Sequence, residues 1–278
     1  EIWRPAQRPP GPRQLAFFFH GVHESADTCT VQVMAEMCTQ KLGMEFACME
    51  HHGHGRSYGT RAMVESFELL CDDAMEFIAW YVASSPNDRF CVIGHSMGGA
   101  VVTWIGDKLV AKYGLRLIGC ILLAPSLSSS HPVSGVTSLS VQAMSVLAPW
   151  APLGPPDNVD GSRPPAEAAS YKASPHHYLG KMRIRTVKVF LDLFSRTDNA
   201  LDRGLLKLGF PFVILHGDQD PTVQIQGSQR LLDAAQSCDK TLVALEGEGH
   251  QPLCTPGRRD VLEATANWLR PRLSAPAP

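Results

Sequence analysis

The residue with the clearest chemical potential is a serine set among glycines, Ser96 in the sequence GHSMG from Gly94 to Gly98. An apolar run that contains Val92 and Ile93 precedes the serine, and a helix-like apolar segment follows it. At a strand-to-helix turn the backbone of such a serine is strained, so its neighbours must be small. The pattern therefore favours a turn that lifts a nucleophilic hydroxyl above the carboxyl edge of a parallel sheet, over a serine that only packs a tight turn.

A serine hydroxyl needs a base, and the base needs a carboxylate that fixes its tautomer. Two later strand-like runs end in suitable residues: VILHGDQDPTV contains Asp218 and Asp220, and VALEGEGHQP contains His250. We predict a triad of Ser96, Asp220 and His250. Asp220 is preferred because it lies further along its loop and can reach the histidine, whereas Asp218 is expected to hydrogen-bond within its own turn.

Acyl transfer also requires two donors for the oxyanion of the tetrahedral intermediate. We expect one to be the backbone N–H of Met97, at the positive end of the helix that follows the serine. The other is expected to be the N–H of Val22, in the loop after the first long apolar run. Glu246 and Glu248 lie close to His250 in sequence and are interpreted as solvated or turn-bonding groups.

The histidine-rich sequence HHGHGR, from His51 to Arg56, raises the alternative of a metal site. Zinc would need a fourth ligand or an open site with supporting carboxylates, and nothing nearby in the sequence is placed to supply one. We interpret this segment as a glycine-containing turn between a strand and a helix. The sequence PHHY, from Pro175 to Tyr178, is interpreted in the same way, and we predict no metal and no organic cofactor.

The elements that must position these residues alternate between strand-like and helix-like patterns. Alternation of this kind predicts an α/β fold with a mostly parallel sheet covered by helices on both faces. The expected strands span residues 15–21, 44–50, 89–94, 117–125, 210–217 and 241–247. The expected helices span residues 30–42, 67–81, 100–113, 222–235 and 258–269.

The alternation is interrupted once, over residues 126–209. This stretch is rich in Ser, Pro and Gly and becomes helical again near residues 182–194. It is too long for a simple connection, so we predict an inserted cap. The expected organisation is a core formed by residues 1–125 and 210–273, a cap or lid over 126–209, and a disordered tail over 274–278.

Composition limits the functional classes. The chain has 278 residues, 25 Lys and Arg against 27 Asp and Glu, and no basic stripe, which argues against a nucleic-acid partner. The eight cysteines include no CxxC pair, so we expect reduced thiols rather than a zinc ribbon. No apolar stretch is long enough to span a bilayer. We expect a cytoplasmic protein that can associate peripherally with membranes. Because the chain does not begin with Met, we also expect that its N-terminus was shortened or processed.

These residues and their order resemble those of the α/β-hydrolase fold family and, within it, of the monoacylglycerol lipase group of serine hydrolases. The resemblance covers nearly the whole chain. It rests on FFFHGVHE, GHGRS, GHSMGGA, LHGDQDPTV, SCDKTLVALEGEGH and the longer segment ASPHHYLGKMRIRTVKVFLDLFSRTDNAL. It implies ester hydrolysis through an acyl-serine intermediate, and the HGxxD pattern implies that Asp220 is the acid.

One helix-like segment of the predicted cap bears on the substrate. Its apolar residues share one helical face and are followed by a tryptophan: Val136, Leu139, Ala143, Met144, Leu147 and Trp150. One interpretation is a hydrophobic mouth that admits an acyl chain or rests on a membrane surface. The alternative is that this face packs on the sheet domain. The two interpretations are not exclusive.

The sequence thus predicts a lipid esterase, with monoacylglycerol as the expected substrate and fatty acid and glycerol as products. Lysophospholipase or general carboxylesterase activity is the alternative within the same fold, and the triad also serves perhydrolysis and acyl transfer. A non-catalytic ligand-binding member of the fold is disfavoured because all three triad residues are present.

Overall fold

The computed structural model describes residues 1–278 except for 8, 86, 130–134, 157–164, 256 and 275–278. The side chains of residues 135–137, 154–156, 166, 167 and 170 also lie outside the description. The expectation of a disordered tail falls on residues 275–278 and is therefore outside the described part of the chain. Ser274 is described and follows the last helix directly.

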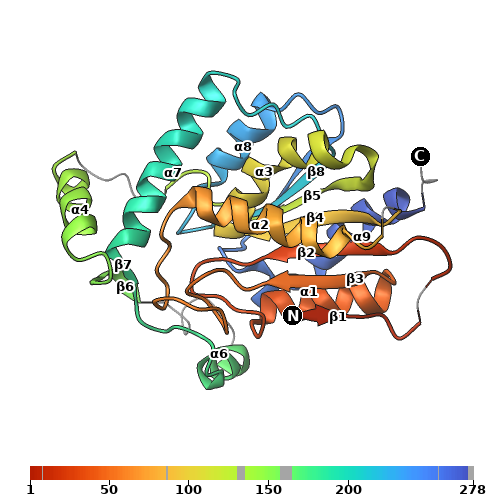
Figure 1. Ribbon diagram of the computed structural model, residues 1–278, viewed down its shortest axis with the longest axis horizontal. Coiled ribbons are helices and arrows are strands. Elements are labelled where there is room, and N and C mark those ends of the chain that lie inside the picture. Colours follow the sequence, from red (N-terminus) through yellow and green to blue (C-terminus); the bar gives the residue numbers. More distant parts are fainter. Residues whose placement is uncertain (8, 86, 130–134, 157–164, 256, 275–278) are drawn as a thin grey trace.

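A seven-stranded, mostly parallel sheet forms the centre of the molecule (Figure 1), which confirms the predicted α/β-hydrolase architecture. The strand order is β1-β3-β2-β4-β5-β8-β9, and only β1 runs antiparallel to its neighbour. The strands are β1 (Ile2–Trp3), β2 (Gln14–Phe19), β3 (Glu45–Met49), β4 (Arg89–His95), β5 (Leu117–Leu123), β8 (Phe212–Gly217) and β9 (Lys240–Leu245).

The order of the strands places a topological switch point between β2 and β4. After β2 the chain goes to β3 on one side, and it then crosses to β4 on the other side of β2. The loops that leave the carboxyl ends of β2 and β4 therefore diverge. Ligand sites in open parallel sheets form at such a switch point, and here the loops contain Val22 and Ser96.

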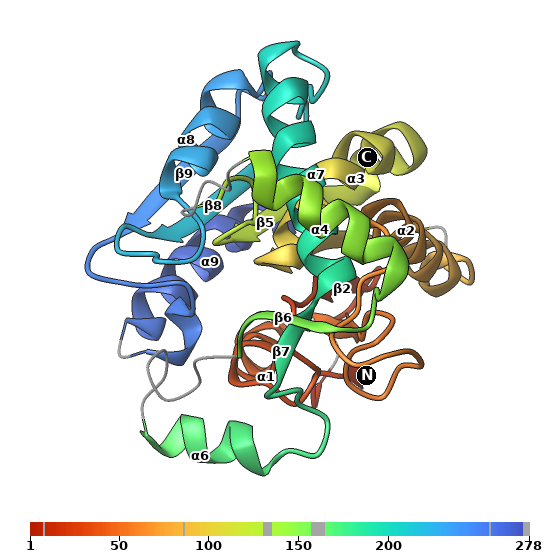
Figure 2. The same cartoon turned by 90° about the vertical axis from the view of Figure 1, so that its left-hand side faces the viewer.

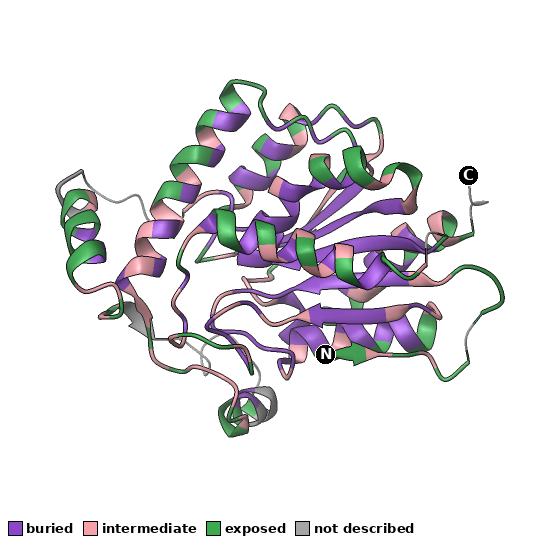
Figure 3. Cartoon of the chain, viewed as in Figure 1, coloured by how far each residue is buried: buried purple, intermediate pink, exposed green. Residues whose placement is uncertain are grey.

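Helices cover both faces of the sheet (Figures 1 and 3). α2 (Phe67–Val82), α3 (Met97–Tyr113) and α8 (Ile225–Ala234) pack on one face, and α1 (Cys29–Glu36) and α9 (Arg258–Leu273) pack on the other. β2 shows why both faces are buried: Leu15, Phe17 and Phe19 face one helical layer while Ala16 and Phe18 face the other. A doubly covered strand is apolar throughout rather than alternating.

Most predicted elements are present with shifted ends. The helix expected at 100–113 begins at Met97, the one expected at 222–235 begins at Ile225, and the one expected at 258–269 continues to Leu273. The helix expected at 30–42 ends at Glu36 and continues as a π-helical turn over Met37–Lys41. Strand β1 was not predicted, because two residues carry no periodicity.

The connection between β5 and β8 covers the stretch for which the sequence predicts an inserted cap, and we call the elements of this connection the insertion. It comprises α4 (Gly135–Leu147), β6 (Pro152–Pro156), α6 (Pro165–Ala173), β7 (Lys181–Arg183) and α7 (Ile184–Asp202). β6 and β7 pair with each other in a separate two-stranded sheet. Figure 2 shows α4, β6, β7 and α6 together on one side of the molecule, whereas α7 reaches back and contributes Val189 and Leu193 to the main core.

All eight cysteines are described, and all are free thiols. Cys91 and Cys120 are fully buried inside β4 and β5, where a thiol acts as a small apolar group. Within the described residues, no helix has both the length and the apolar composition needed to cross a membrane.

Candidate active site

Ser96 lies at the junction of β4 and α3, where the sequence predicts a nucleophile turn. Its φ is 51° and its ψ is −114°, a combination that residues with a side chain rarely adopt. The Ser96 N–H donates to the carbonyl oxygen of Leu123 at 2.9 Å, which ties the strained residue to the neighbouring strand. The side chain is at the carboxyl edge of the sheet, and the residue is 5% exposed.

The glycines around Ser96 are required by close backbone approaches. A Cβ on Gly98 would overlap the carbonyl oxygen of Phe19, and a Cβ on Gly94 would overlap the carbonyl oxygen of Gly98. A Cβ on Gly99 would lie 2.8 Å from the Cα of Pro125. The absence of side chains therefore lets α3 start close against both β2 and the loop after β5, as the sequence predicted.

The structure brings the three predicted triad side chains into one hydrogen-bonded chain. His250 Nε2 lies 2.9 Å from Ser96 Oγ, and His250 Nδ1 lies 2.7 Å from Asp220 Oδ2. Each residue follows a different strand: Ser96 follows β4, Asp220 follows β8 and His250 follows β9. Because a carboxylate only accepts hydrogen bonds, Nδ1 carries the proton and Nε2 is free to accept one from the serine.

Asp220 is held as an anion by its surroundings. Its side chain is only 1% exposed, and burial by itself would raise its pKa. Hydrogen bonds from His216 and His250 and from the backbone N–H of Val223 outweigh burial, so the pKa of Asp220 lies well below its usual value. His216 Nε2 lies 3.2 Å from Asp220 Oδ2.

The other carboxylates near the triad have separate partners. Asp218 Oδ1 accepts from the backbone N–H of Gly247 at 2.8 Å, so the prediction that it bonds within its own turn is wrong. The bond instead joins the loops after β8 and β9. Glu246 is exposed, and Glu248 accepts a hydrogen bond from the hydroxyl of Thr255.

The loop with the predicted oxyanion donor passes beside Ser96. A Cβ on Gly21 would lie 3.1 Å from Ser96 Cβ, which places the adjoining Val22 next to the nucleophile turn. Met97 is the first residue of α3, so its N–H has no acceptor within the helix. The assignment of Val22 and Met97 as the two donors stays a prediction.

A buried ion pair between Glu24 and His95 is hydrogen-bonded to the backbone of this loop. Glu24 Oε2 accepts from the N–H of Gly21 at 2.6 Å and from His95 Nδ1 at 2.9 Å, and His95 Nε2 donates to the carbonyl oxygen of His250 at 3.0 Å. Both ring nitrogens of His95 face acceptors, so the ring is cationic. Burial lowers the pKa of His95, but the adjacent Glu24 carboxylate raises it, and the net result is a pKa above the ordinary value of histidine.

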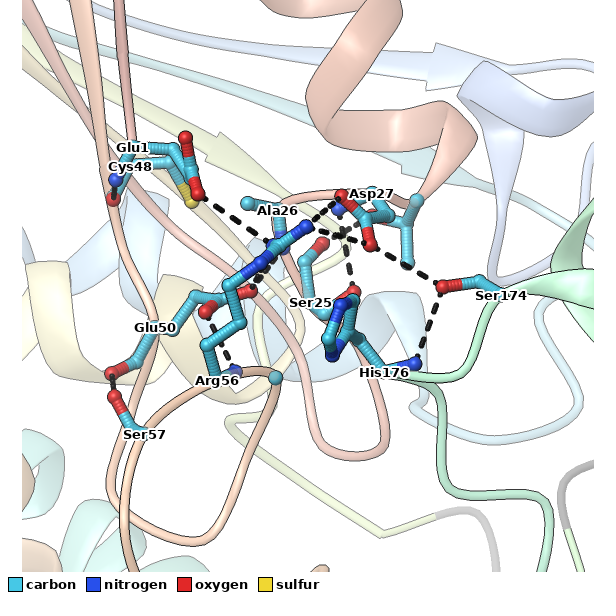
Figure 4. A network of polar contacts seen from close by, with 12 residues as sticks. Glu1, Ser25, Ala26, Asp27, Cys48, Glu50, Arg56, Ser57, Ser174 and His176 are labelled. Atoms are coloured by element: carbon cyan, nitrogen blue, oxygen red, sulfur yellow. Dashed lines mark hydrogen bonds and ion pairs between the residues drawn. The ribbon is translucent and has the colours of Figure 1, made fainter.

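Arg56 forms ion pairs with the loop after β2 and with neighbouring carboxylates (Figure 4). Its guanidinium pairs with Asp27 at 3.1 Å, with Glu50 at 3.5 Å and with Glu1 at 3.6 Å. Asp27 also accepts from the hydroxyl of Ser174, which belongs to the insertion. The loop after β2 is thereby attached both to the core and to the insertion.

Two further contacts connect the same loop to the insertion. The hydroxyl of Tyr171 donates to the carbonyl oxygen of His23 at 3.2 Å, and Ser25 Oγ lies 3.0 Å from His177 Nδ1. His177 is one of the two histidines of the PHHY segment, which therefore connects the insertion to the loop after β2.

The histidine-rich turn packs beneath the loop. His51 and His54 are buried against His20, with ring centroids 4.7 Å and 5.4 Å from the His20 ring. Over the described parts of the chain, no group of three or more His, Cys, Asp or Glu side chains is arranged to hold a metal ion. The histidines act here as packing groups.

A cavity of about 470 Å³ lies elsewhere, between α2 and the loop after β3. Its lining includes His52, Phe77 and Trp80 but none of the triad residues. It is therefore a separate feature from the candidate active site.

Sequence reasoning missed four polar groups of the site, namely Glu24, His95, Ser126 and His216. Three of them adjoin a predicted segment, and Ser126 follows the carboxyl end of β5. The contacts of Glu24, His95 and Ser126 join loops that are far apart in the sequence, and no local spacing reveals such pairs. His216 contacts Asp220, only four residues away. The position at the end of a parallel strand was the available signal.

With this geometry established, comparison with known proteins gives the family. The family model described as "Serine aminopeptidase, S33" matches residues 10–256. The chain belongs to the serine aminopeptidase S33 family of hydrolases.

Proteins with similar sequences include enzymes named as lipases. A monoacylglycerol lipase of Mycolicibacterium smegmatis is 27% identical over 97% of this chain and 91% of its own length. The human monoglyceride lipase is 27% identical over 89% of this chain and 78% of its own length. This S33 family member therefore resembles the monoglyceride lipases over most of its sequence.

A solved structure supports the fold. A soluble variant of monoglyceride lipase from Saccharomyces cerevisiae, solved in complex with a substrate analogue, aligns with a TM-score of 0.81. The alignment covers 99% of this chain and 91% of that one at 18% identity. At that identity the likeness shows the α/β-hydrolase fold.

Proposed function

We propose that the protein hydrolyses carboxylic ester bonds of lipids, and that monoacylglycerol is its substrate. The observation that carries the proposal is the hydrogen-bonded chain from Asp220 through His250 to Ser96, with distances of 2.7 Å and 2.9 Å. Nucleophile, base and orienting carboxylate are the parts that acyl transfer through a serine requires.

In the acylation half of the reaction, Ser96 Oγ attacks the ester carbonyl carbon while His250 Nε2 takes the hydroxyl proton. Asp220 holds the ring by Nδ1 and stabilises the imidazolium that forms. The N–H groups of Val22 and Met97 bind the oxyanion. His250 then gives the proton to the departing glycerol, and an ester of Ser96 remains.

In the second half, water attacks the acyl carbon and gives its proton to His250 Nε2. The bond between the acyl carbon and Ser96 Oγ breaks, and the proton passes from His250 to Ser96 Oγ. The fatty acid leaves and the enzyme returns to its starting state. These steps use only groups of the chain, the ester and water.

The choice of monoacylglycerol rests on the named relatives and on the insertion beside the site. A glycerol monoester has one long apolar tail and a small polar head. An apolar pocket suits the tail, while polar groups near Ser96 can bind the head.

The proposal is tested with purified protein and a panel of substrates. A fluorophosphonate probe is expected to label the wild type and to leave Ser96→Ala unlabelled. Long-chain monoacylglycerol is expected to be hydrolysed faster than lysophosphatidylcholine or a short p-nitrophenyl ester. Ser128→Ala serves as a matched control, because it removes a hydroxyl from the loop after β5 that bonds to Gln224 rather than to the triad.

Each outcome bears on one level of the proposal. Undiminished labelling of Ser96→Ala would overturn the nucleophile assignment. Faster hydrolysis of lysophosphatidylcholine would identify a lysophospholipase, and faster hydrolysis of the short ester would identify a general carboxylesterase.

We also propose that α4 contacts a membrane surface that supplies the substrate. Three apolar residues of its predicted face are exposed: Leu139 at 66%, Met144 at 47% and Leu147 at 78%. Trp150, three residues after the end of α4, is 60% exposed. The alternative that these side chains pack on the sheet domain is wrong, while the side chain of Val136 lies outside the described residues. Exposed apolar side chains gathered on one helix are typical of an interaction surface.

A further inference from the structure

A second buried hydroxyl lies beside the nucleophile. Ser126 is 2% exposed, and its Oγ is 3.2 Å from Ser96 Oγ. The backbone N–H of Ser126 also donates to the carbonyl oxygen of Ser96 at 2.9 Å. Two contacts to the same residue, one from the main chain and one from the side chain, fix this hydroxyl relative to Ser96.

The turn after β5 directs Ser126 toward the nucleophile. Ala124 has a φ of 40°, a left-handed conformation that residues with a Cβ rarely adopt, and its N–H donates to the carbonyl oxygen of Leu215 at 2.9 Å. Pro125 follows and packs against Gly99 at the start of α3. The backbone here is thus constrained from both sides.

The hydrogen bonds of the triad fix the direction of the contact between the two serines. Asp220 accepts, so His250 Nδ1 donates and His250 Nε2 accepts the proton of the Ser96 hydroxyl. Ser96 Oγ then has lone pairs left but no proton to give. The Ser126 hydroxyl is therefore the donor and Ser96 Oγ is the acceptor.

We propose that Ser126 is a catalytic residue that donates a hydrogen bond to Ser96 Oγ and so accelerates the breakdown of the acyl-enzyme. This inference rests on the proposed function. An alcohol or alkoxide oxygen accepts a hydrogen bond well, whereas an ester oxygen accepts poorly. A fixed donor at Oγ therefore favours the free serine over the acylated serine.

The donor acts at one step of the reaction. In deacylation the bond between the acyl carbon and Ser96 Oγ breaks, negative charge grows on Oγ, and the proton held by His250 moves to it. The Ser126 hydrogen bond strengthens as that charge grows, while Ser126 keeps its own proton. In acylation the charge on Oγ changes in the opposite direction, so the same bond gives no advantage.

The test is pre-steady-state hydrolysis of a p-nitrophenyl ester by Ser126→Ala. We expect a burst of p-nitrophenol near one equivalent, followed by turnover slowed roughly tenfold to a hundredfold, the range of a lost hydrogen bond to a charged group. Acyl-Ser96 should accumulate and be detectable by mass spectrometry of the quenched enzyme. The rate of fluorophosphonate labelling should not fall, because labelling needs only the attack by Ser96.

Matched variants separate a donor from a packing group. Ser126→Thr keeps a hydroxyl and should restore fast turnover, and Ser126→Cys keeps a similar volume with a weaker donor and should give intermediate slowing. Ser128→Ala lacks a hydroxyl two residues away and should behave as the wild type. Melting temperatures of all variants report whether folding is intact.

Two results would overturn the role of Ser126: a decrease of the burst and the steady-state rates by the same factor, or unchanged turnover in Ser126→Ala. Either result would leave ester hydrolysis by the wild type intact. A wild type that neither hydrolyses esters nor reacts with the probe would overturn the proposed function itself, and the role of Ser126 with it.

Discussion

Ser96 has φ and ψ angles of 51° and −114°, and residues held in such sparsely populated regions carry about 1–3 kcal/mol of strain. The strain persists because the turn is fixed on two sides, by the bond to Leu123 and by the close packing at Gly98. It keeps the hydroxyl in place beside His250, so little reorganisation is needed when a substrate binds.

At the same scale, Asp220→Asn is expected to lower kcat by roughly 10³- to 10⁴-fold. An amide nitrogen facing His250 Nδ1 would favour the tautomer with the proton on Nε2, and that tautomer cannot accept the proton of Ser96. The backbone bonds from Thr222 and Val223 can be kept by the amide oxygen, so the fold should survive. Steady-state kinetics on the best ester substrate measure the effect.

Asp218→Asn is the matched control for that prediction. Asp218 is exposed and bonds to Gly247, so the variant should retain wild-type kcat. A larger loss in Asp218→Asn than in Asp220→Asn would contradict the choice between the two acids.

The contrast between the triad and Ser126 shows what the sequence could predict at this scale. Ser96, Asp220 and His250 each follow a strand-like run, and the fold class then requires them to meet at one edge. Ser126 also follows such a run, but its meaning depends on the backbone angles of Ala124 and on a contact with Ser96 across 30 positions. No pattern of residue types encodes that contact.

Among the secondary-structure elements, the strands and helices with clear periodicity were predicted, but several of their ends lie at other residues than expected. α3 begins three residues earlier than expected. The sequence predicts a later start because Gly98 and Gly99 have low helix propensity. In the structure both positions are helical, and the close packing against Phe19 and Pro125 requires glycine there. Strands β1 and β7 were not predicted because two or three residues give no pattern, and β6 was not predicted because its sequence, PLGPP, consists mostly of Pro and Gly. Tertiary contacts decide both cases.

The exposed face of α4 leads to a prediction about membranes. Leu139→Glu combined with Leu147→Glu should lower the partition of the protein onto phospholipid vesicles by more than about tenfold, because burying each leucine contributes about 1.5–3 kcal/mol. Hydrolysis of a water-soluble ester should stay near the wild-type rate. Co-sedimentation with vesicles measures the partition.

Leu115→Glu provides the control for surface charge. Leu115 is 71% exposed in the turn before β5, at the opposite edge of the sheet from the triad. Vesicle binding should be unaffected by this change. Equal partition of the α4 variant and the wild type would contradict a membrane role for α4.

On the scale of the whole molecule, the candidate site depends on loops from five strands and on the insertion. The loop after β2 is connected to both the core and the insertion: Arg56 and Ser174 bind Asp27 (Figure 4). The hydroxyl of Tyr171 donates to the carbonyl oxygen of His23. His20, the first residue of this loop, packs against His51 and His54 from the turn after β3. Because these rings pack between two loops of the core, we expect their ionisation to change the free energy of unfolding of the whole protein.

All three histidines are neutral in the folded protein. His20 Nδ1 donates to the carbonyl oxygen of Gly21 and Nε2 accepts from the N–H of His51, which leaves no room for a second ring proton. Neither ring nitrogen of His51 has a hydrogen-bond partner among the described residues. Burial lowers the pKa of all three rings, for His54 to about 3.

These lowered pKa values predict that stability decreases as the pH falls. Below the ordinary histidine pKa of about 6.5, the unfolded chain binds protons that the folded protein excludes, so acid favours unfolding. Each such histidine contributes a slope that approaches about 1.4 kcal/mol per pH unit between its two pKa values. Urea unfolding at pH 7, 6 and 5 should show this decrease in the free energy of unfolding.

His51→Phe isolates one member of the cluster. Phenylalanine can pack against Phe19, breaks no hydrogen bond of the ring, and does not titrate. Between pH 6 and pH 5 the free energy of unfolding of the variant should decrease less steeply than that of the wild type. The difference in slope should approach about 1.4 kcal/mol per pH unit, the value for one proton. Parallel curves for His51→Phe and the wild type would mean that His51 binds protons equally in the folded and unfolded chains, in contradiction to its buried, unpartnered ring.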